Sequence, residues 1–164
     1  MKLRNVVLAL AVVSLVAIPA FAKNNKGDVP QIQDLAVQII AAEGETPEMV
    51  EFSWADITEA EKYSLDIEGA GWVTIVDVVD PVWVEFSVSY SAVASPLALP
   101  VEDVLNDLAA AVLAELGVEI EDVLGGELLE LSAKVKGLDP LDKLDVKSQD
   151  NMFSESLDLM PLFD

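Results

Sequence analysis

Hydrophobic and polar residues alternate with a period of two over much of the region from residue 34 to residue 90. This period places every second side chain on the same face of an extended strand, so it predicts strands that are buried on one face. Residues 72–79 add a continuous apolar run, and Gly69-Ala70-Gly71 before it predicts a loop. Pro81 has no main-chain N–H to donate, so it predicts a corner or an edge strand. The alternating segments are 34–39, 50–55, 63–68 and 82–90.

The spacing changes after Pro100, where apolar residues recur every three or four positions. This spacing is typical of an amphipathic helix, and Glu102 and Asp103 in its first turn favour the positive end of the helix dipole. Gly117 follows the last apolar residue and can adopt the left-handed conformation that ends a helix. We therefore predict one helix over residues 101–116. Its apolar residues are Val101, Val104, Leu105, Leu108, Val112 and Leu116.

Alternation returns in residues 127–138, and a weaker alternating segment covers residues 152–159. Several short strands, interrupted by a single helix between the fifth and the sixth, are typical of two stacked antiparallel sheets rather than of an α/β fold. We therefore expect a mainly β chain that forms an antiparallel β-sandwich over residues 31–160. A flexible lead-in at residues 23–30 precedes this domain, and a short tail at residues 161–164 follows it.

Three of the predicted strands resemble strands of a fibronectin type III or related immunoglobulin-like domain. Phe52-Ser53-Trp54, Lys62-Tyr63-Ser64-Leu65-Asp66-Ile67 and Leu131-Ser132-Ala133-Lys134-Val135-Lys136-Gly137-Leu138 are similar to the second, third and sixth strands of that family. The resemblance implies a sandwich with Trp54 in its core. The family's tyrosine near the start of the sixth strand would fall at Leu131, so the hydroxyl that ties that corner is missing here.

The predicted helix is unusual for a fibronectin type III domain and carries a second resemblance. Val101-Glu102-Asp103-Val104-Leu105-Asn106-Asp107-Leu108, followed by the turn Leu116-Gly117-Val118, looks like part of the N-terminal domain of SusE-type outer-membrane starch-binding proteins. The resemblance covers about residues 30–160. It implies a carbohydrate-binding accessory protein of a polysaccharide-uptake system.

Residues 1–22 have the pattern of a cleavable signal peptide. Lys2 and Arg4 precede an apolar run from Val6 to Ile18, and Ala20-Phe21-Ala22 supplies small residues around a cleavage position. The run is shorter than the roughly 20 apolar residues that a membrane-spanning helix needs, although an uncleaved anchor is the alternative. No cysteine follows the cleavage position for lipid attachment. We expect a secreted or periplasmic protein with no stable membrane insertion after cleavage.

Acidic residues dominate the charge of the chain, since 30 Asp and Glu outnumber 9 Lys and Arg and give a net charge of −21. Cleavage after Ala22 would remove Lys2 and Arg4 but no acidic residue, which would bring the net charge to −23. Such a surface repels phosphate groups, which argues against nucleic acids and anionic membranes as partners. Cations and basic proteins remain open as partners, and so does a role of the charge in solubility alone.

The chain contains no histidine and no cysteine. This absence removes His-dependent triads, thiol nucleophiles and thiolate or imidazole metal sites, so we expect no enzymatic activity. Two carboxylates across a cleft can hydrolyse glycosides, but the sequence nominates no such pair. Calcium prefers oxygen ligands, and four aspartates fall close together after the sixth strand. These candidate calcium ligands are Asp139, Asp142, Asp145 and Asp150.

Trp83 and Glu85 are the candidate ligand-binding residues of the predicted fifth strand. If Val84 and Phe86 face the core, Trp83 points outward beside Glu85, because neighbours along a strand face opposite sides. Burial of Trp83 under the helix at residues 101–116 is the alternative, and the pattern assigns Trp72 to neither face. We expect an exported, non-enzymatic binding or adhesion module whose ligand is an unknown protein or a glycan. The alternative is the carbohydrate-binding accessory role.

Overall fold

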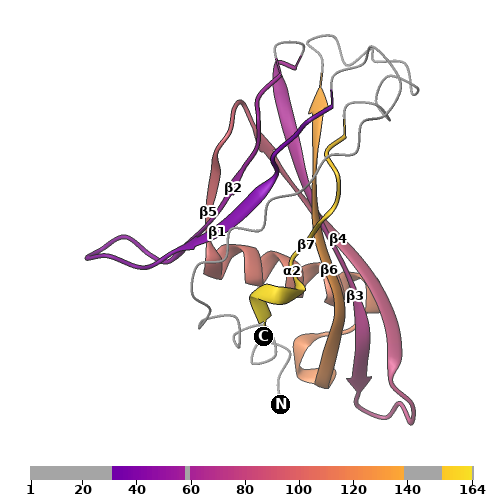
Figure 1. The fold of residues 1–164 in the computed structure, drawn as a ribbon. Coiled ribbons are helices and arrows are strands. Elements are labelled where there is room, and N and C mark those ends of the chain that lie inside the picture. The colour runs from indigo at the N-terminus through magenta and orange to yellow at the C-terminus, as the bar shows by residue number, and fades with distance from the viewer. Residues whose placement is uncertain (1–30, 58–59, 139–152, 164) are drawn as a thin grey trace.

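The computed structural model describes residues 31–57, 60–138 and 153–163, which form two antiparallel sheets and one α-helix (Figure 1). One sheet has the strand order β1-β2-β5, and the other has the order β4-β3-β6-β7. The strands are β1 (Ala36–Ile40), β2 (Met49–Ser53), β3 (Lys62–Ile75), β4 (Val82–Ala92), β5 (Leu97–Pro100), β6 (Val123–Leu138) and β7 (Leu157–Asp158). The helices are α2 (Val101–Leu116) and the 3₁₀ helices η2 (Ile120–Asp122) and η3 (Met160–Phe163).

This architecture confirms the predicted fold class, which is an antiparallel β-sandwich with one helix between the fifth and sixth strands. The first, second and fifth strands form one sheet, and the remaining strands form the other. This division is compatible with an immunoglobulin or fibronectin type III-like sandwich. Figure 1 shows that the four-stranded sheet is the longer of the two and that the β3–β4 hairpin extends past α2.

The core lies between the two sheets and contains Trp54, as the sequence predicts. Trp54 is only 6% exposed, and its ring centroid lies 5.2 Å from that of Tyr63 on β3. The main-chain N–H of Ile57 donates a hydrogen bond of 2.8 Å to the Tyr63 hydroxyl. A tyrosine of β3 therefore holds the segment after β2 by a hydrogen bond. Leu131 of β6, at the position of the family's tyrosine, is a buried apolar residue and offers no hydroxyl.

Helix α2 begins and ends where the sequence predicts. Glu102 and Asp103 lie exposed in its first turn, and Gly117 adopts a left-handed φ of 65° at its end. The N–H of Gly117 donates to the carbonyl of Leu113 at 2.9 Å, which satisfies one of the last carbonyls of the helix. Its apolar face packs into the core through Val101, Val104, Leu108 and Val112.

Tyr90 of β4 connects that strand to α2. The Tyr90 hydroxyl donates a hydrogen bond of 2.8 Å to Oδ2 of Asp107 on the helix. Burial raises the pKa of Tyr90 well above its ordinary value, and the hydrogen bond to Asp107 and the negative charges of Asp107 and Asp103 raise it further. The core side of β4 therefore lies against the helix, which leaves its other face outward.

The predicted loop at Gly69-Ala70-Gly71 is wrong, because β3 continues through these residues to Ile75. A methyl group on Gly71 would collide with the main chain of Glu127, and one on Gly69 would collide with the ring of Phe86. These glycines therefore permit close approach within the sheet and do not form a turn. The first half of the apolar run at residues 72–79 is the end of β3 and the second half lies beyond that strand, and the short strand β5 was not predicted.

The predicted final strand at residues 152–159 is reduced to the two residues of β7. The main-chain N–H of Val135 donates 2.7 Å to the Ser154 hydroxyl, while the Ser154 N–H donates 2.9 Å to the Val135 carbonyl. A side-chain oxygen thus replaces a main-chain acceptor, and this interrupts the ladder. Leu162, which the prediction assigned to the tail, is buried in the core.

Several predicted features lie outside the described residues and stay predictions. They are the signal peptide at 1–22, the lead-in at 23–30 and the candidate calcium ligands Asp139, Asp142, Asp145 and Asp150. Within residues 31–57, 60–138 and 153–163, no helix combines the length and the apolar character needed to cross a membrane.

Candidate functional site

Two tryptophans stand side by side on the outer face of the four-stranded sheet, near the end of the β3–β4 hairpin. Trp72 of β3 and Trp83 of β4 are direct partners in the antiparallel register. Their neighbours Val73 and Val84 are buried, so the alternation of a strand turns both indoles away from the core. Trp72 is 43% exposed and Trp83 is 39% exposed. We call these two residues the tryptophan pair.

The tryptophan pair has a defined geometry. The two ring centroids lie 5.1 Å apart with an interplanar angle of 67°, which is a favourable edge-to-face arrangement. Trp83 Nε1 donates a hydrogen bond of 3.2 Å to Oε1 of Glu85, the next residue on the same face of β4. The outward orientation predicted for Trp83 is therefore observed, and α2 does not bury it.

A groove of about 370 Å³ lies beside Trp72, and its lining runs from Pro81, just before β4, across Thr74 of β3 to the start of β6. In the β3–β6 register, Trp72 lies opposite Glu127 and Thr74 lies opposite Gly125. Gly125 has no side chain, so this part of the groove surface is main chain that a ligand can approach closely. The lining residues are Trp72, Thr74, Pro81, Leu124, Gly125, Gly126 and Glu127.

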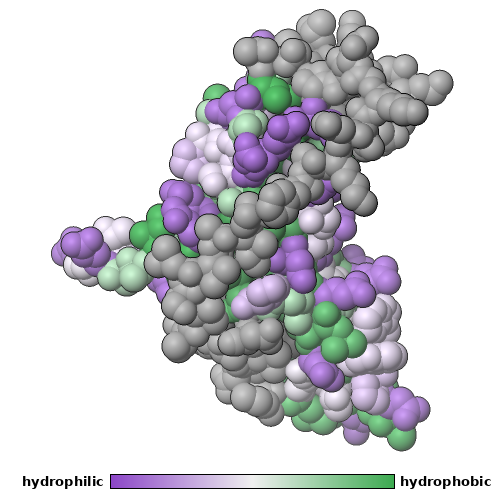
Figure 2. All heavy atoms as spheres, in the orientation of Figure 1, coloured by the Kyte–Doolittle hydropathy of each residue, from purple (hydrophilic) through white to green (hydrophobic). Residues whose placement is uncertain are grey.

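Further apolar side chains are exposed near this end of the sheet. Figure 2 shows apolar residues in green at the lower end of the molecule, where the β3–β4 hairpin ends. Exposed apolar side chains at this end of the sheet make it a candidate contact region, and Leu124 shares the groove lining with Trp72. The exposed residues of the hairpin turn and of the start of β6 are Val76, Val78, Val79 and Leu124.

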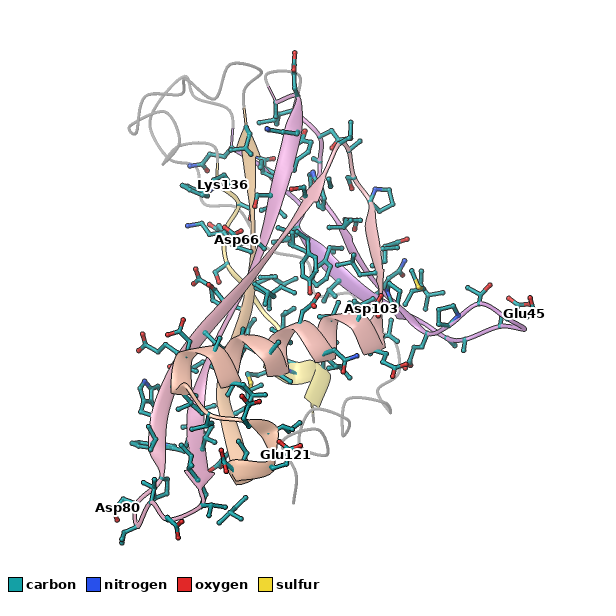
Figure 3. The ribbon with its side chains drawn as sticks, turned by 180° about the vertical axis from the view of Figure 1, so that it is seen from behind. Glu45, Asp66, Asp80, Asp103, Glu121 and Lys136 are labelled. Atoms are coloured by element: carbon teal, nitrogen blue, oxygen red, sulfur yellow. The ribbon has the colours of Figure 1, made fainter. Side chains whose placement is uncertain are left out.

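Asp80 and Lys136 lie at opposite ends of the four-stranded sheet (Figure 3). Figure 3 shows Asp80 at the tip of the β3–β4 hairpin and Lys136 toward the other end of the sheet. Lys134 Nζ lies 4.1 Å from the ring centroid of Phe153, and Lys136 Nζ lies 5.8 Å from the same centroid. These two cations therefore lie against an aromatic ring away from the tryptophan pair.

A second groove of about 480 Å³ is polar and lined by four glutamates: Glu68, Glu85, Glu115 and Glu130. Ser87 and Ser132 also line it, on either side of Glu68 in the strand registers. In the part of the chain that the structure describes, no three acidic side chains are grouped closely enough to hold a metal ion. This groove gives a cation no set of ligands, but it makes the surface next to Glu85 strongly acidic.

Sequence reasoning named Trp83 and Glu85 as candidates but did not name the residues that the structure places beside them. Trp72 was left unassigned because residues 72–79 formed one apolar run without alternation. In the structure, residues 72–75 end one side and residues 82–92 form the other side of a hairpin whose turn contains Pro81, and Trp72 pairs with Trp83 across it. The sequence did not point to Thr74, Gly125 or Glu127. Their position beside Trp72 results from the β3–β6 pairing and its register shifts, and no local pattern in the sequence predicts these.

Comparisons of the chain with known protein families, with curated proteins and with solved structures found no match of any of the three kinds.

Proposed function

We propose that the chain is an exported, non-enzymatic binding module whose binding surface is the tryptophan pair and its surroundings. The observation that carries this proposal is the exposure of two adjacent indoles, Trp72 at 43% and Trp83 at 39%, on neighbouring strands. Tryptophan is among the residues that contribute most to binding energies, because a partner that covers it removes a large apolar area from water.

Other features support the remaining parts of the proposal. The signal peptide pattern of residues 1–22 supports export, and the lack of histidine and cysteine supports a non-enzymatic role. The net charge of −21 favours neutral or basic ligands over anionic ones. The tryptophan pair is built on two strands of a sheet, which hold it more rigidly than a loop would.

A carbohydrate-binding accessory protein is the second candidate function. The resemblance of residues 101–108 to SusE-type starch-binding proteins suggested it, and the groove beside Trp72 favours it, because aromatic side chains beside polar groups are usual in ligand sites. This second candidate is a special case of the first, in which the ligand of the binding module is a glycan and the process is polysaccharide uptake.

The test measures binding of the secreted chain to two ligand classes, which are neutral oligosaccharides and a lysine-rich peptide. We compare the wild type with the double variant Trp72→Ala/Trp83→Ala. Val93→Ala is the matched control, because Val93 is an apolar residue that is 80% exposed in the β4–β5 connection. We expect binding of at least one class, loss of that binding in the double variant and no loss in the control.

Two results would contradict the proposed function. One is binding that the double variant retains in full, and the other is no binding of either class by the wild type. Thermal unfolding of each variant shows that the chain remains folded, which is expected because both indoles lie on the surface.

A further inference from the structure

We propose that the groove beside Trp72 binds a neutral glycan chain. This inference rests on the proposed function, because it assigns a ligand class to the same surface. A sugar ring presents an apolar face of C–H groups and an edge of hydroxyl groups. A site for it therefore needs a flat aromatic surface next to hydrogen-bonding groups, and both are present here.

Trp72 supplies the aromatic surface. It is the largest side chain of the groove, and nearly half of it is exposed. The edge contact with Trp83 at 5.1 Å restrains its ring, and the hydrogen bond from Trp83 to Glu85 restrains the second ring in turn. A restrained indole loses little conformational freedom when a ligand covers it, so more of the contact energy remains for binding.

The hydrogen-bonding groups come from the facing strands β3 and β6. The Thr74 hydroxyl can donate and accept, and the Glu127 carboxylate can accept from two sugar hydroxyls. Gly125 lies opposite Thr74 and leaves its main chain uncovered, so a ring can lie close to the sheet between Trp72 and β6. These groups replace water as hydrogen-bond partners of the sugar hydroxyls. They therefore fix the orientation of the sugar ring, which stacking on Trp72 alone does not.

The charge around the groove selects a neutral glycan. Glu85 and Glu127 are the ionisable neighbours of the tryptophan pair, and Asp80 lies at the tip of the same hairpin (Figure 3). Lys134 and Lys136 lie against Phe153, toward the other end of the sheet. Among residues 31–57, 60–138 and 153–163, a uronic acid or sulfated sugar would meet carboxylates here without a cation lining the groove, and this repulsion is strongest at low salt.

The arrangement also favours a chain of several sugars over a single one. Trp83 lies outside the groove but in edge contact with Trp72, so a second sugar ring can lie on the exposed indole of the neighbouring strand. A lysine-rich peptide is the competing ligand, because the groove lined by Glu68 and Glu130 shares Glu85 with this surface. Among the residues that the structure describes, the only aromatic one that lines that groove is Phe86, which is just 8% exposed, so the groove offers a sugar little stacking surface and offers a lysine side chain several carboxylates.

The experiment is isothermal titration of the secreted chain at low salt with maltohexaose, cellohexaose, xylohexaose and mannohexaose. Oligogalacturonate of similar length is the anionic control, and a lysine-rich peptide is the competing ligand. The variants are Trp72→Ala, Trp72→Phe and Thr74→Val, with Val93→Ala as the control for loss of an exposed apolar side chain. Thr74→Val keeps the shape of the residue and removes only its hydroxyl.

We expect at least one neutral hexasaccharide to bind and oligogalacturonate not to bind. Trp72→Ala should weaken binding at least about tenfold, which corresponds to about 1.4 kcal/mol, since central aromatic contacts are among the most costly to truncate. Trp72→Phe should restore part of the loss, Thr74→Val should weaken binding less than Trp72→Ala, and Val93→Ala should leave it unchanged.

Three results would overturn the inference: none of the four hexasaccharides binds, oligogalacturonate binds as well as they do, or Trp72→Ala binds as well as the wild type. If only the lysine-rich peptide binds, and Trp72→Ala/Trp83→Ala abolishes this, the glycan inference fails while the proposed function stands. If nothing binds, both fail.

Discussion

The sandwich core and the end of the β3–β4 hairpin each contain a pair of aromatic rings, and the two pairs are alike in spacing. Trp54 and Tyr63 have centroids 5.2 Å apart, and Trp72 and Trp83 have centroids 5.1 Å apart. Their surroundings differ, because Trp54 and Tyr63 are buried whereas both members of the tryptophan pair are more than one-third exposed. The same ring contact therefore stabilises the fold in one region and leaves apolar surface for a partner in the other.

The difference follows from which face of the sheet each residue occupies. Tyr63 is on the face of β3 that the three-stranded sheet covers, so its ring and that of Trp54 leave water on folding. Trp72 is on the opposite face of the same strand, because the two positions are an odd number of residues apart. The comparison predicts that substitutions in the first pair affect mainly stability and that substitutions in the second affect mainly binding.

Trp54→Ala should have the largest effect on stability. It removes a buried indole and leaves a cavity against Tyr63, which costs about 3–5 kcal/mol. Urea unfolding followed by circular dichroism measures the free energy of unfolding. A loss below about 1 kcal/mol, which is typical of surface positions, would show that the two aromatic pairs do not differ as described.

Gly71→Ala tests the close approach of β3 and β6 just before Trp72. The added methyl group collides with the main chain of Glu127, so we expect a loss of about 1–3 kcal/mol and a shift in tryptophan emission. Gly44→Ala is the control, since a methyl group there meets nothing within 4 Å and only its φ of 60° is strained. If Gly44→Ala shifts the emission as much as Gly71→Ala, the packing argument is wrong.

Tyr90→Phe tests the hydrogen bond between β4 and α2, which lies on the core side of β4 and not on its outer face. The folded chain holds the pKa of Tyr90 above its ordinary value of 10.0, so well below pH 10.0 the residue is protonated in both states and its contribution to stability is fully present and independent of pH. Above that pH the unfolded chain releases the proton first, so stability falls as pH rises toward the folded-state pKa. Unfolding between about pH 9 and pH 11 should show a shallower fall for Tyr90→Phe, and an unchanged slope would contradict the assignment.

Trp83→Ala should have the smallest effect on stability. It removes the edge contact with Trp72 but leaves no closed cavity, because Trp83 is 39% exposed, so we expect a loss of about 0.5–1.5 kcal/mol. The same urea experiment measures it beside Trp54→Ala. A loss equal to that of Trp54→Ala would mean that Trp83 is a structural residue and would remove the reason to regard it as a binding residue.

The sequence predicts the fold well where periodicity is a local property. Helix α2 and its end at Gly117 follow from residue spacing, and the outward position of Trp83 follows from alternation in β4. Gly69 and Gly71 were misread as a loop, because a glycine required by a neighbouring strand looks the same in the sequence as a glycine required by a turn. The groove beside Trp72 depends on how β3 and β6 pair, and strand pairing is not encoded in either strand alone.

The indole N–H signals of the ¹⁵N-labelled chain test the central claim most directly, because the chain has three tryptophans and therefore three such signals. Single substitutions assign them, and the chain is then titrated with each neutral hexasaccharide and with the lysine-rich peptide. We predict that at least one of these ligands shifts the signals of Trp72 and Trp83 and leaves that of Trp54 in place. Signals of Trp72 and Trp83 that stay fixed with every ligand, or a shift of Trp54 as large as theirs, would contradict the claim.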